Sequence, residues 1–123
     1  MSLNIDELGT IYIHQGDSGD VIVQGLPNDK DYRIFFAVRD DKRNLIGDEL
    51  VVNSNFSDSV TFSLRPELTD LFSVPEDESY SVYYYGLKLC SGDIEDTLFI
   101  SGSGYGQLNH IIVYPKRVEG FYE

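Results

Sequence analysis

Short runs in which apolar and polar side chains alternate recur along this chain, and they limit its fold more than any other feature. The clearest run is residues 59–64, where Val60, Phe62 and Leu64 alternate with serine and threonine side chains. Successive side chains of a β-strand point to opposite faces of a sheet, so such a run has one face for a core and one for water. The chain is therefore predicted to be built from β-strands.

Other segments show the same strand-like character and are separated by turn residues. Strands are expected at residues 10–15, 21–24, 33–39, 46–52, 80–90, 96–101 and 108–114. In residues 33–39 apolar side chains fall on both faces, which indicates a strand inside a sheet or one whose outer face is also covered. The glycine- and aspartate-rich residues 16–20 predict a hairpin or a sharp corner. Gly86 predicts a bulge or a close approach of another backbone.

Residues 66–72 break the alternation. Leucine and phenylalanine side chains recur there three and four positions apart, Pro66 suits the first turn of a helix, and Pro75 prevents a long continuation. We therefore expect one or two helical turns that close an edge of the fold.

The expected elements fit one domain, because a chain of 123 residues holds a single hydrophobic core. The predicted fold class is all-β, an antiparallel immunoglobulin-like β-sandwich of about 7–8 strands spanning residues 1–123. Residues 1–8 and 116–123 are expected to be flexible ends. A small barrel has the same periodicity and stays open as an alternative.

The net charge of the chain limits the classes of partner that it can bind. Asp and Glu number 21 against nine Lys and Arg, which gives a formal net charge of −12. Nucleic-acid binding relies on basic side chains that neutralise phosphates, and anionic membranes attract the same residues, so we expect neither kind of partner. No run approaches the ~18 apolar residues of a membrane span, and no signal peptide is visible. The negative surface instead favours basic partners.

Few residues are candidates for chemistry. Cys90 is the only cysteine, which excludes an intrachain disulfide, and we interpret it as a buried or strand-end thiol rather than a reactive one. His14 and His110 lie inside expected strands without zinc-ligand spacing. A catalytic arrangement with Cys90 would also need an orienting acid and an oxyanion hole. We therefore predict no catalytic, cofactor-binding or metal-binding residues and no enzyme activity.

Two kinds of loop have a composition that is also found in calcium-binding or phosphate-binding sites. Acidic residues gather within 17–20, 40–41, 76–78 and 93–96, and calcium prefers such oxygen-rich loops, yet none has the EF-hand pattern and the net charge accounts for them. Calcium stays a minor alternative. The glycine-rich residues 102–106 precede an expected strand, so no helix amino terminus is present there to hold a phosphate, and we expect a flexible connection.

Tyrosine is the residue type most suited to contact with a partner. Tyr83, Tyr84 and Tyr85 are consecutive in an expected strand, so at least one of them should face outward. Exposed tyrosine often anchors protein and sugar contacts because its large ring loses little entropy on binding. Tyr83, Tyr85 and Tyr105 are our candidate interaction surface. Packing of these rings under loops or under the helical turn is the alternative.

The order of several segments along the chain is familiar. These segments are Gln15-Gly16-Asp17, Phe35-Phe36-Ala37-Val38-Arg39, Pro66-Glu67-Leu68-Thr69, Tyr80-Ser81-Val82-Tyr83-Tyr84-Tyr85-Gly86-Leu87-Lys88-Leu89, Asp96-Thr97-Leu98 and Val113-Tyr114-Pro115. Together they resemble the small β-sandwich of tailed-phage and prophage proteins, similar to the amino-terminal domain of baseplate upper proteins. The likeness spans nearly the whole chain through loose motifs. In longer members a further region follows the sandwich, whereas this chain ends at Glu123.

The resemblance implies a structural role in the virion, with no catalytic residues. We therefore expect a non-enzymatic protein of a phage or prophage tail or baseplate, assembled in the bacterial cytoplasm. Its partners would be other tail or baseplate proteins or further copies of itself. The alternative is a ligand-binding module of a bacterial surface protein that recognises glycans through exposed tyrosine, with help from calcium.

Overall fold

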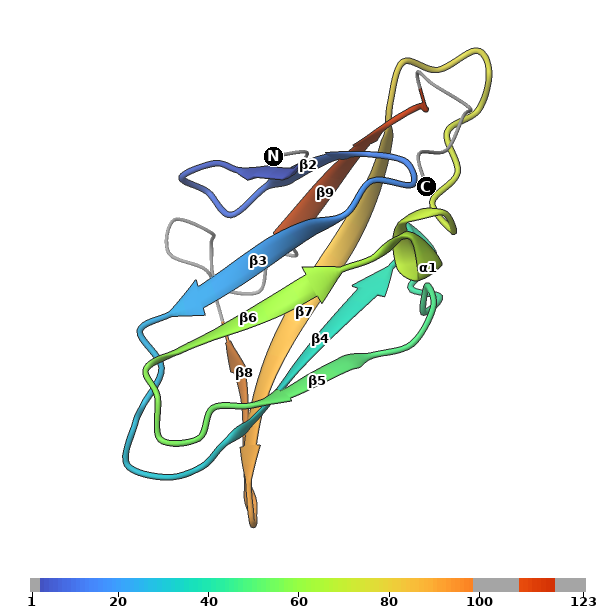
Figure 1. Cartoon of the computed structure of the whole chain (residues 1–123). Helices are drawn as coiled ribbons and strands as arrows, with labels where there is room; N and C mark the ends of the chain where they lie inside the picture. Colours follow the sequence, from blue (N-terminus) through green and yellow to red (C-terminus); the bar gives the residue numbers. More distant parts are fainter. Residues whose placement is uncertain (1–2, 99–108, 117–123) are drawn as a thin grey trace.

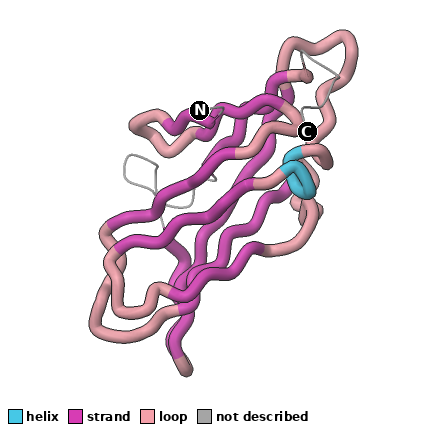
Figure 2. Tube along the Cα trace, viewed as in Figure 1, coloured by secondary structure: helices cyan, strands magenta, loops and turns pink. Residues whose placement is uncertain are grey.

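The computed structural model describes residues 3–98 and 109–116, and this part of the chain is almost entirely β-structure (Figures 1 and 2). Its elements are β1 (Leu3–Ile5), β2 (Ile11–His14), β3 (Gly19–Gln24), β4 (Arg33–Arg39), β5 (Leu50–Asn53), β6 (Ser59–Leu64), α1 (Pro66–Thr69), β7 (Ser81–Ser91), β8 (Ile94–Leu98) and β9 (Asn109–Tyr114). The all-β prediction is confirmed. In the described residues, no helix is long and apolar enough to cross a membrane.

The strands form two sheets. Seven of them make the larger sheet in the order β1-β2-β9-β7-β4-β5, with β8 also paired to β7. β7 is long enough to pair with two strands along one edge, because residues 81–85 pair with β9 and residues 87–91 pair with β8, while β4 pairs with its other edge. β3 and β6 form a second, two-stranded sheet that lies over the larger one in Figure 1.

One strand pair departs from the predicted antiparallel arrangement. β2 and β9 run parallel, with Ile11 opposite Ile111, whereas the other pairs of named strands are antiparallel. Parallel neighbours need a long crossover, and here the chain passes through both sheets between the two strands. The larger sheet is therefore mixed. Alternation of side chains reports which face is buried but not which way a neighbouring strand runs.

The core lies between the two sheets, where the alternation places it. Val60, Phe62 and Leu64 of β6 are each at most 8% exposed. The ring of Phe62 lies 5.4 Å from that of Phe36 on β4, between centroids, and this contact joins the sheets. Complete burial of such a side chain contributes about 1.5–3 kcal/mol. β4 lies between β7 and β5, which confirms an interior strand at residues 33–39.

The turn after β2 is a corner rather than a hairpin. β2 belongs to the larger sheet and β3 to the smaller one, so the chain crosses from one layer to the other. Gly16 has φ of +82°, in the left-handed region, and a Cβ there would come within 2.7 Å of Asp70 Oδ1. The left-handed backbone and the close Asp70 side chain therefore favour glycine at this corner.

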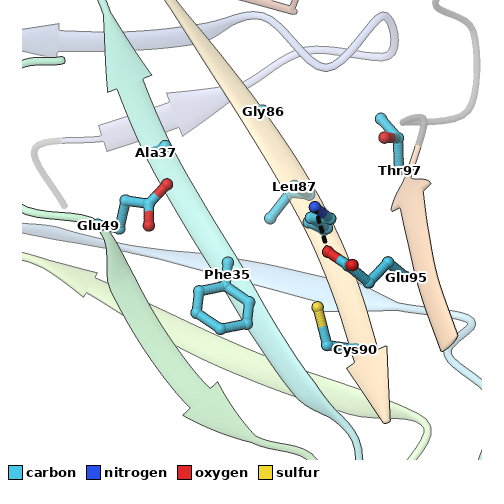
Figure 3. A pocket seen from close by; sticks show the side chains of 9 residues that line it. Phe35, Ala37, Glu49, Gly86, Leu87, Cys90, Glu95 and Thr97 are labelled. Carbon is cyan, nitrogen blue, oxygen red and sulfur yellow. Dashed lines mark ion pairs between the residues drawn. The ribbon is translucent and has the colours of Figure 1, made fainter. Parts of the chain in front are cut away.

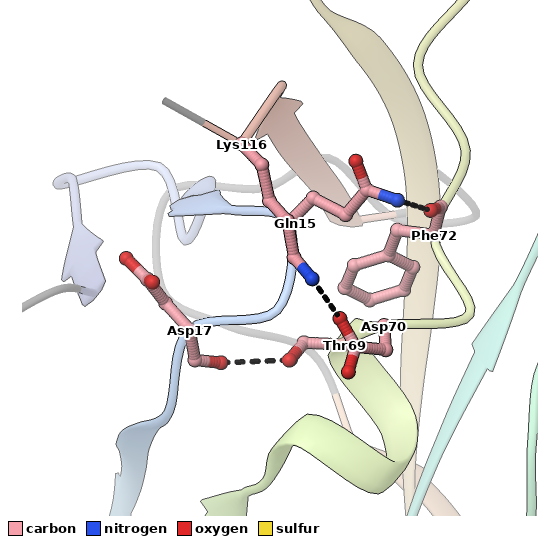
Figure 4. A network of polar contacts seen from close by, with 6 residues as sticks. All are labelled: Gln15, Asp17, Thr69, Asp70, Phe72 and Lys116. Carbon is pink, nitrogen blue, oxygen red and sulfur yellow. Dashed lines mark hydrogen bonds and ion pairs between the residues drawn. The ribbon is translucent and has the colours of Figure 1, made fainter. Parts of the chain in front are cut away.

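The corner is tied to α1 and to the end of β9 (Figure 4). The Gln15 side chain donates a hydrogen bond of 2.8 Å to the Phe72 carbonyl, and the wholly buried Thr69 hydroxyl donates one of 2.7 Å to the Asp17 carbonyl. Lys116 Nζ lies 3.1 Å from Asp70 Oδ1. The expected helical turn is confirmed, and it closes one end of the sandwich.

The first described residues of the chain are part of the sheet. Residues 1–8 were expected to be flexible, but residues 3–5 form β1, which pairs with β2, and Leu3 is only 4% exposed. The Asp6 carboxylate accepts hydrogen bonds of 2.9 Å from the amides of Leu8 and Thr10, which holds the turn between the two strands. A three-residue strand is too short to show a period of two. Residues 117–123 lie outside the described residues.

Candidate interaction site on the outer face of the larger sheet

Two of the three tyrosines predicted to form a contact surface belong to the core. Tyr83 is 8% exposed and Tyr85 is 3% exposed. The Tyr85 ring stacks 5.2 Å from Phe36, and its hydroxyl donates a hydrogen bond to the Gly9 carbonyl. The Tyr83 hydroxyl accepts a hydrogen bond of 2.8 Å from the Ser73 amide. Neither ring offers an exposed surface, and Tyr105 lies outside the described residues.

Tyr84 is the tyrosine of this run that faces outward, so the expectation of at least one outward ring is confirmed. Its ring lies 5.2 Å from His110 on the neighbouring strand β9, between centroids. On the same face, His14 of β2 lies 5.4 Å from Tyr114 of β9. The two histidines thus pack beside tyrosine rings on the outer face of the larger sheet.

The residues considered for nucleophilic chemistry are far apart. His110 lies opposite Tyr84 on β7, and Cys90 is six positions further along β7, roughly 20 Å at about 3.3 Å per residue. Cys90 is a buried free thiol, as predicted. Within residues 3–98 and 109–116, no group of three or more His, Cys, Asp and Glu side chains is placed to hold a metal ion.

The central feature of the outer face is a hollow of about 340 Å³ over Ala37 and Gly86, which we call the Gly86 hollow (Figure 3). These two small residues lie directly opposite each other on β4 and β7. A Cβ added at Gly86 would meet nothing within 4 Å, and the pairing with β4 continues through it without interruption. The predicted bulge or close backbone approach at Gly86 is therefore wrong, because the space above it is open.

The Gly86 hollow combines an apolar floor with a charged rim. Phe35 and Cys90 line it beside Ala37 and Gly86, whereas Glu49 stands on the β5 side and Glu95 on the β8 side (Figure 3). Such a lining suits a side chain or small ligand with an apolar body and a polar end.

One charge of the rim is already balanced. Lys88 Nζ lies 2.6 Å from Glu95 Oε1. The hydrogen bond from Lys88 lowers the pKa of Glu95, and the same bond raises the pKa of Lys88. The ion pairs within the described part of the chain are Lys88–Glu95 and Lys116–Asp70, so Glu49 is paired with no described cation. Lys88 also interacts with the charge of Glu49, so one cation serves two carboxylates and the rim keeps a net negative charge.

A second hollow, of about 500 Å³, lies where the turn after β4 meets the segment before β7, and we call it the Tyr80 hollow. Its lining includes the rings of Tyr80 and Tyr84 and the carboxylates of Asp41 and Glu78. Asp40 also lines it, but hydrogen bonds from the Asn44 and Lys42 amides hold that carboxylate in its own turn and lower its pKa. Tyr80 is 48% exposed, so its ring is more accessible than that of Tyr84.

Sequence reasoning missed both hollows for identifiable reasons. The Gly86 hollow depends on Ala37 lying opposite Gly86, which is a property of strand register and not of either segment alone. The Tyr80 hollow forms where the turn after β4 meets the segment before β7, and local alternation does not report contacts between such distant segments. No protein-family model and no curated protein matches the chain.

Proposed function

We propose that this chain is a non-enzymatic interaction module that binds another protein through the outer face of its larger sheet, at the Gly86 hollow. The open space over Ala37 and Gly86 is the observation that carries the proposal. Glycine inside a strand costs about 0.5–1 kcal/mol relative to alanine, and no neighbouring atom requires it at position 86. A pocket that receives one anchoring side chain is the typical centre of a protein contact.

The positions of the reactive groups favour a binding role over catalysis. Cys90 and His110 are separated along β7 and β9, and both histidines lie against tyrosine rings. A thiol nucleophile would need a base within hydrogen-bond reach. Cys90 instead supplies apolar surface to the Gly86 hollow.

For the biological setting we propose an immunoglobulin-like sandwich of a phage or prophage tail or baseplate, located in the virion and bound to other tail proteins or to copies of itself. Support comes from the segments that carry the resemblance. Residues 15–17, the helix Pro66–Thr69 and residues 113–115 are distant in sequence but lie together. The Gln15 amide donates a hydrogen bond of 2.8 Å to the Tyr114 carbonyl, and the Gly16 amide donates one of 3.3 Å to the Thr69 carbonyl.

The test compares three immobilised forms of the chain in a lysate of the cells or phage that produce it. Gly86→Leu fills the hollow, and Thr61→Leu places the same leucine side chain on the exposed face of β6, away from the hollow. We expect the unchanged chain and Thr61→Leu to retain a common protein that Gly86→Leu loses. Equal retention by all three forms, or by none, would contradict the proposed site. Tail or baseplate proteins in the retained fraction would support the proposed setting, and their absence would count against it.

Glycan binding is a second candidate function, favoured by the exposed Tyr80 ring beside carboxylates in the Tyr80 hollow. Sugars stack on exposed aromatic rings and donate hydrogen bonds to carboxylates. This function predicts retention on an immobilised polysaccharide that Tyr80→Ala abolishes, and a requirement for calcium predicts that a chelator abolishes it too. Passage through the column without delay would exclude this candidate.

A further inference from the structure

We infer that the side chain received by the Gly86 hollow is an arginine of the partner protein. This inference rests on the proposed function and adds the chemistry of the partner. Three properties of the hollow point to arginine: its apolar floor, its size and the charge left on its rim.

The apolar floor of the hollow suits the methylene chain and the planar guanidinium of an arginine. Phe35, Ala37 and Gly86 present an aromatic ring next to two positions with little or no side chain. The chain already places one guanidinium against this ring, because Arg33 Cζ lies 5.9 Å from the Phe35 centroid. Guanidinium groups stack on aromatic faces more readily than ammonium groups do. The methylene stem of a second arginine would cover the remaining apolar floor.

The size of the hollow suits one side chain. Ligand pockets span roughly 300–1,000 Å³, and the Gly86 hollow, at about 340 Å³, lies near the lower limit. An extended segment of the partner would not be enclosed by a space of this size. A single anchoring side chain fits within it.

The rim selects a cation. Lys88 forms an ion pair with Glu95 and also interacts with the charge of Glu49, so its one positive charge leaves an excess of negative charge on the two carboxylates of the rim. An apolar side chain in the hollow would partly bury the Glu49 carboxylate without a hydrogen-bond partner, which costs free energy. An acidic side chain would be repelled by it. A guanidinium can instead form two parallel hydrogen bonds with the carboxylate. The net charge of −12 attracts a basic surface over longer distances.

The experiment uses N-acetyl-arginine amide as the probe in an amide chemical-shift titration of the full chain. N-acetyl-citrulline amide is the control, because it has the same shape without the charge, and N-acetyl-norleucine amide tests a purely apolar anchor. We expect saturable shifts at Ala37, Gly86 and Thr97 with the arginine probe, and roughly tenfold weaker binding of the citrulline probe, the effect of about 1.4 kcal/mol.

Two variants assign the binding to the hollow. Glu49→Gln should reduce the affinity for arginine to that for citrulline and leave citrulline unchanged. Glu49 is exposed, so this change should not disturb folding. Gly86→Leu should abolish the shifts with every probe, whereas Thr61→Leu should preserve them. Gly86→Ala, which adds one methyl group to open space, serves if the leucine variant does not fold.

The outcomes separate this inference from the proposed function. Equal affinity for arginine and citrulline, an affinity for arginine that Glu49→Gln leaves unchanged, or no saturable shift at the hollow would overturn the arginine inference. Norleucine binding alone at the same amides would overturn it while leaving the Gly86 hollow as a contact site. Failure of the proposed function appears separately, as retention of the partner protein by Gly86→Leu.

Discussion

Tyr85 connects two distant parts of the chain through one hydroxyl group. Its side chain is 3% exposed, and the hydroxyl donates a hydrogen bond to the Gly9 carbonyl in the turn before β2. Burial raises the pKa of Tyr85 from 10.0 to about 12. A raised pKa means that folding favours the neutral phenol, so this contribution to stability is complete below pH 10.0. It is lost as the pH rises through about 12, because the unfolded chain ionises first.

Tyr85→Phe makes this contribution measurable. The variant should be less stable at neutral pH by about 1 kcal/mol, because the Gly9 carbonyl loses its donor. Between pH 10 and pH 12 its free energy of unfolding should fall less steeply than that of the unchanged chain. Urea denaturation across this pH range measures both slopes. Parallel slopes for the two chains would show that folding does not raise the pKa of Tyr85.

The sequence predicted which face a side chain occupies only in strands where every second residue is polar. In β6, Phe62 lies between Thr61 and Ser63, so its burial follows from the alternation. Tyr83 and the two residues after it are all tyrosine, so alternating positions of this strand carry identical side chains. The contacts of β7 with β4 and β9 decide which ones turn inward, and these contacts involve residues far away in the sequence.

The turn between β5 and β6 holds a bulky residue in an unfavourable conformation. Asn55 has φ of 50° and Phe56 has φ of 63°, and the Ser57 amide donates a hydrogen bond of 2.9 Å to the Ser54 carbonyl. This is the pattern of a type I′ turn, in which glycine is preferred at the second central position. Phe56 is 61% exposed, so little packing compensates for the conformation of its backbone.

Phe56→Gly should therefore stabilise the chain. Removal of the left-handed strain gains about 1–2 kcal/mol, and the greater freedom of glycine in the unfolded chain costs about 0.5–1 kcal/mol, so we expect a net gain of about 0.5–1 kcal/mol. Phe56→Ala removes the ring but keeps the strain, and its stability should change by less than about 0.5 kcal/mol. Thermal denaturation of both variants measures the difference. A lower melting temperature for Phe56→Gly would mean that the ring packs more favourably than its exposure indicates.

The strands differ in how well their patterns predicted them. β4 and β6 have the predicted bounds, Arg33–Arg39 and Ser59–Leu64, because each places a continuous apolar face on the core. β5 begins at Leu50 and not at residue 46, since the segment before it forms only an isolated bridge between Leu45 and Arg39. The parallel pairing of β2 with β9 and the Gly86 hollow both depend on how strands distant in sequence pair. Local patterns contain no such information.

Charge acts on the molecule as a whole. The chain has 21 acidic and nine basic residues, whereas the ion pairs within residues 3–98 and 109–116 are Lys88–Glu95 and Lys116–Asp70. Exposed ion pairs contribute about 0–1 kcal/mol each, so two of them offset little of the repulsion among the excess carboxylates. Net repulsion should therefore oppose folding at low ionic strength.

Sodium chloride should consequently stabilise the chain. The screening length falls from about 30 Å at 0.01 M salt to about 8 Å at 0.15 M, which weakens repulsion between distant carboxylates more than attraction within a close pair. We expect the free energy of unfolding by urea to rise over this range of salt. A variant with Glu76→Gln, Asp77→Asn and Glu78→Gln removes three exposed negative charges, so it should be more stable at low salt and depend less on salt. A free energy that falls with added salt would mean that specific ion pairs outweigh the general repulsion.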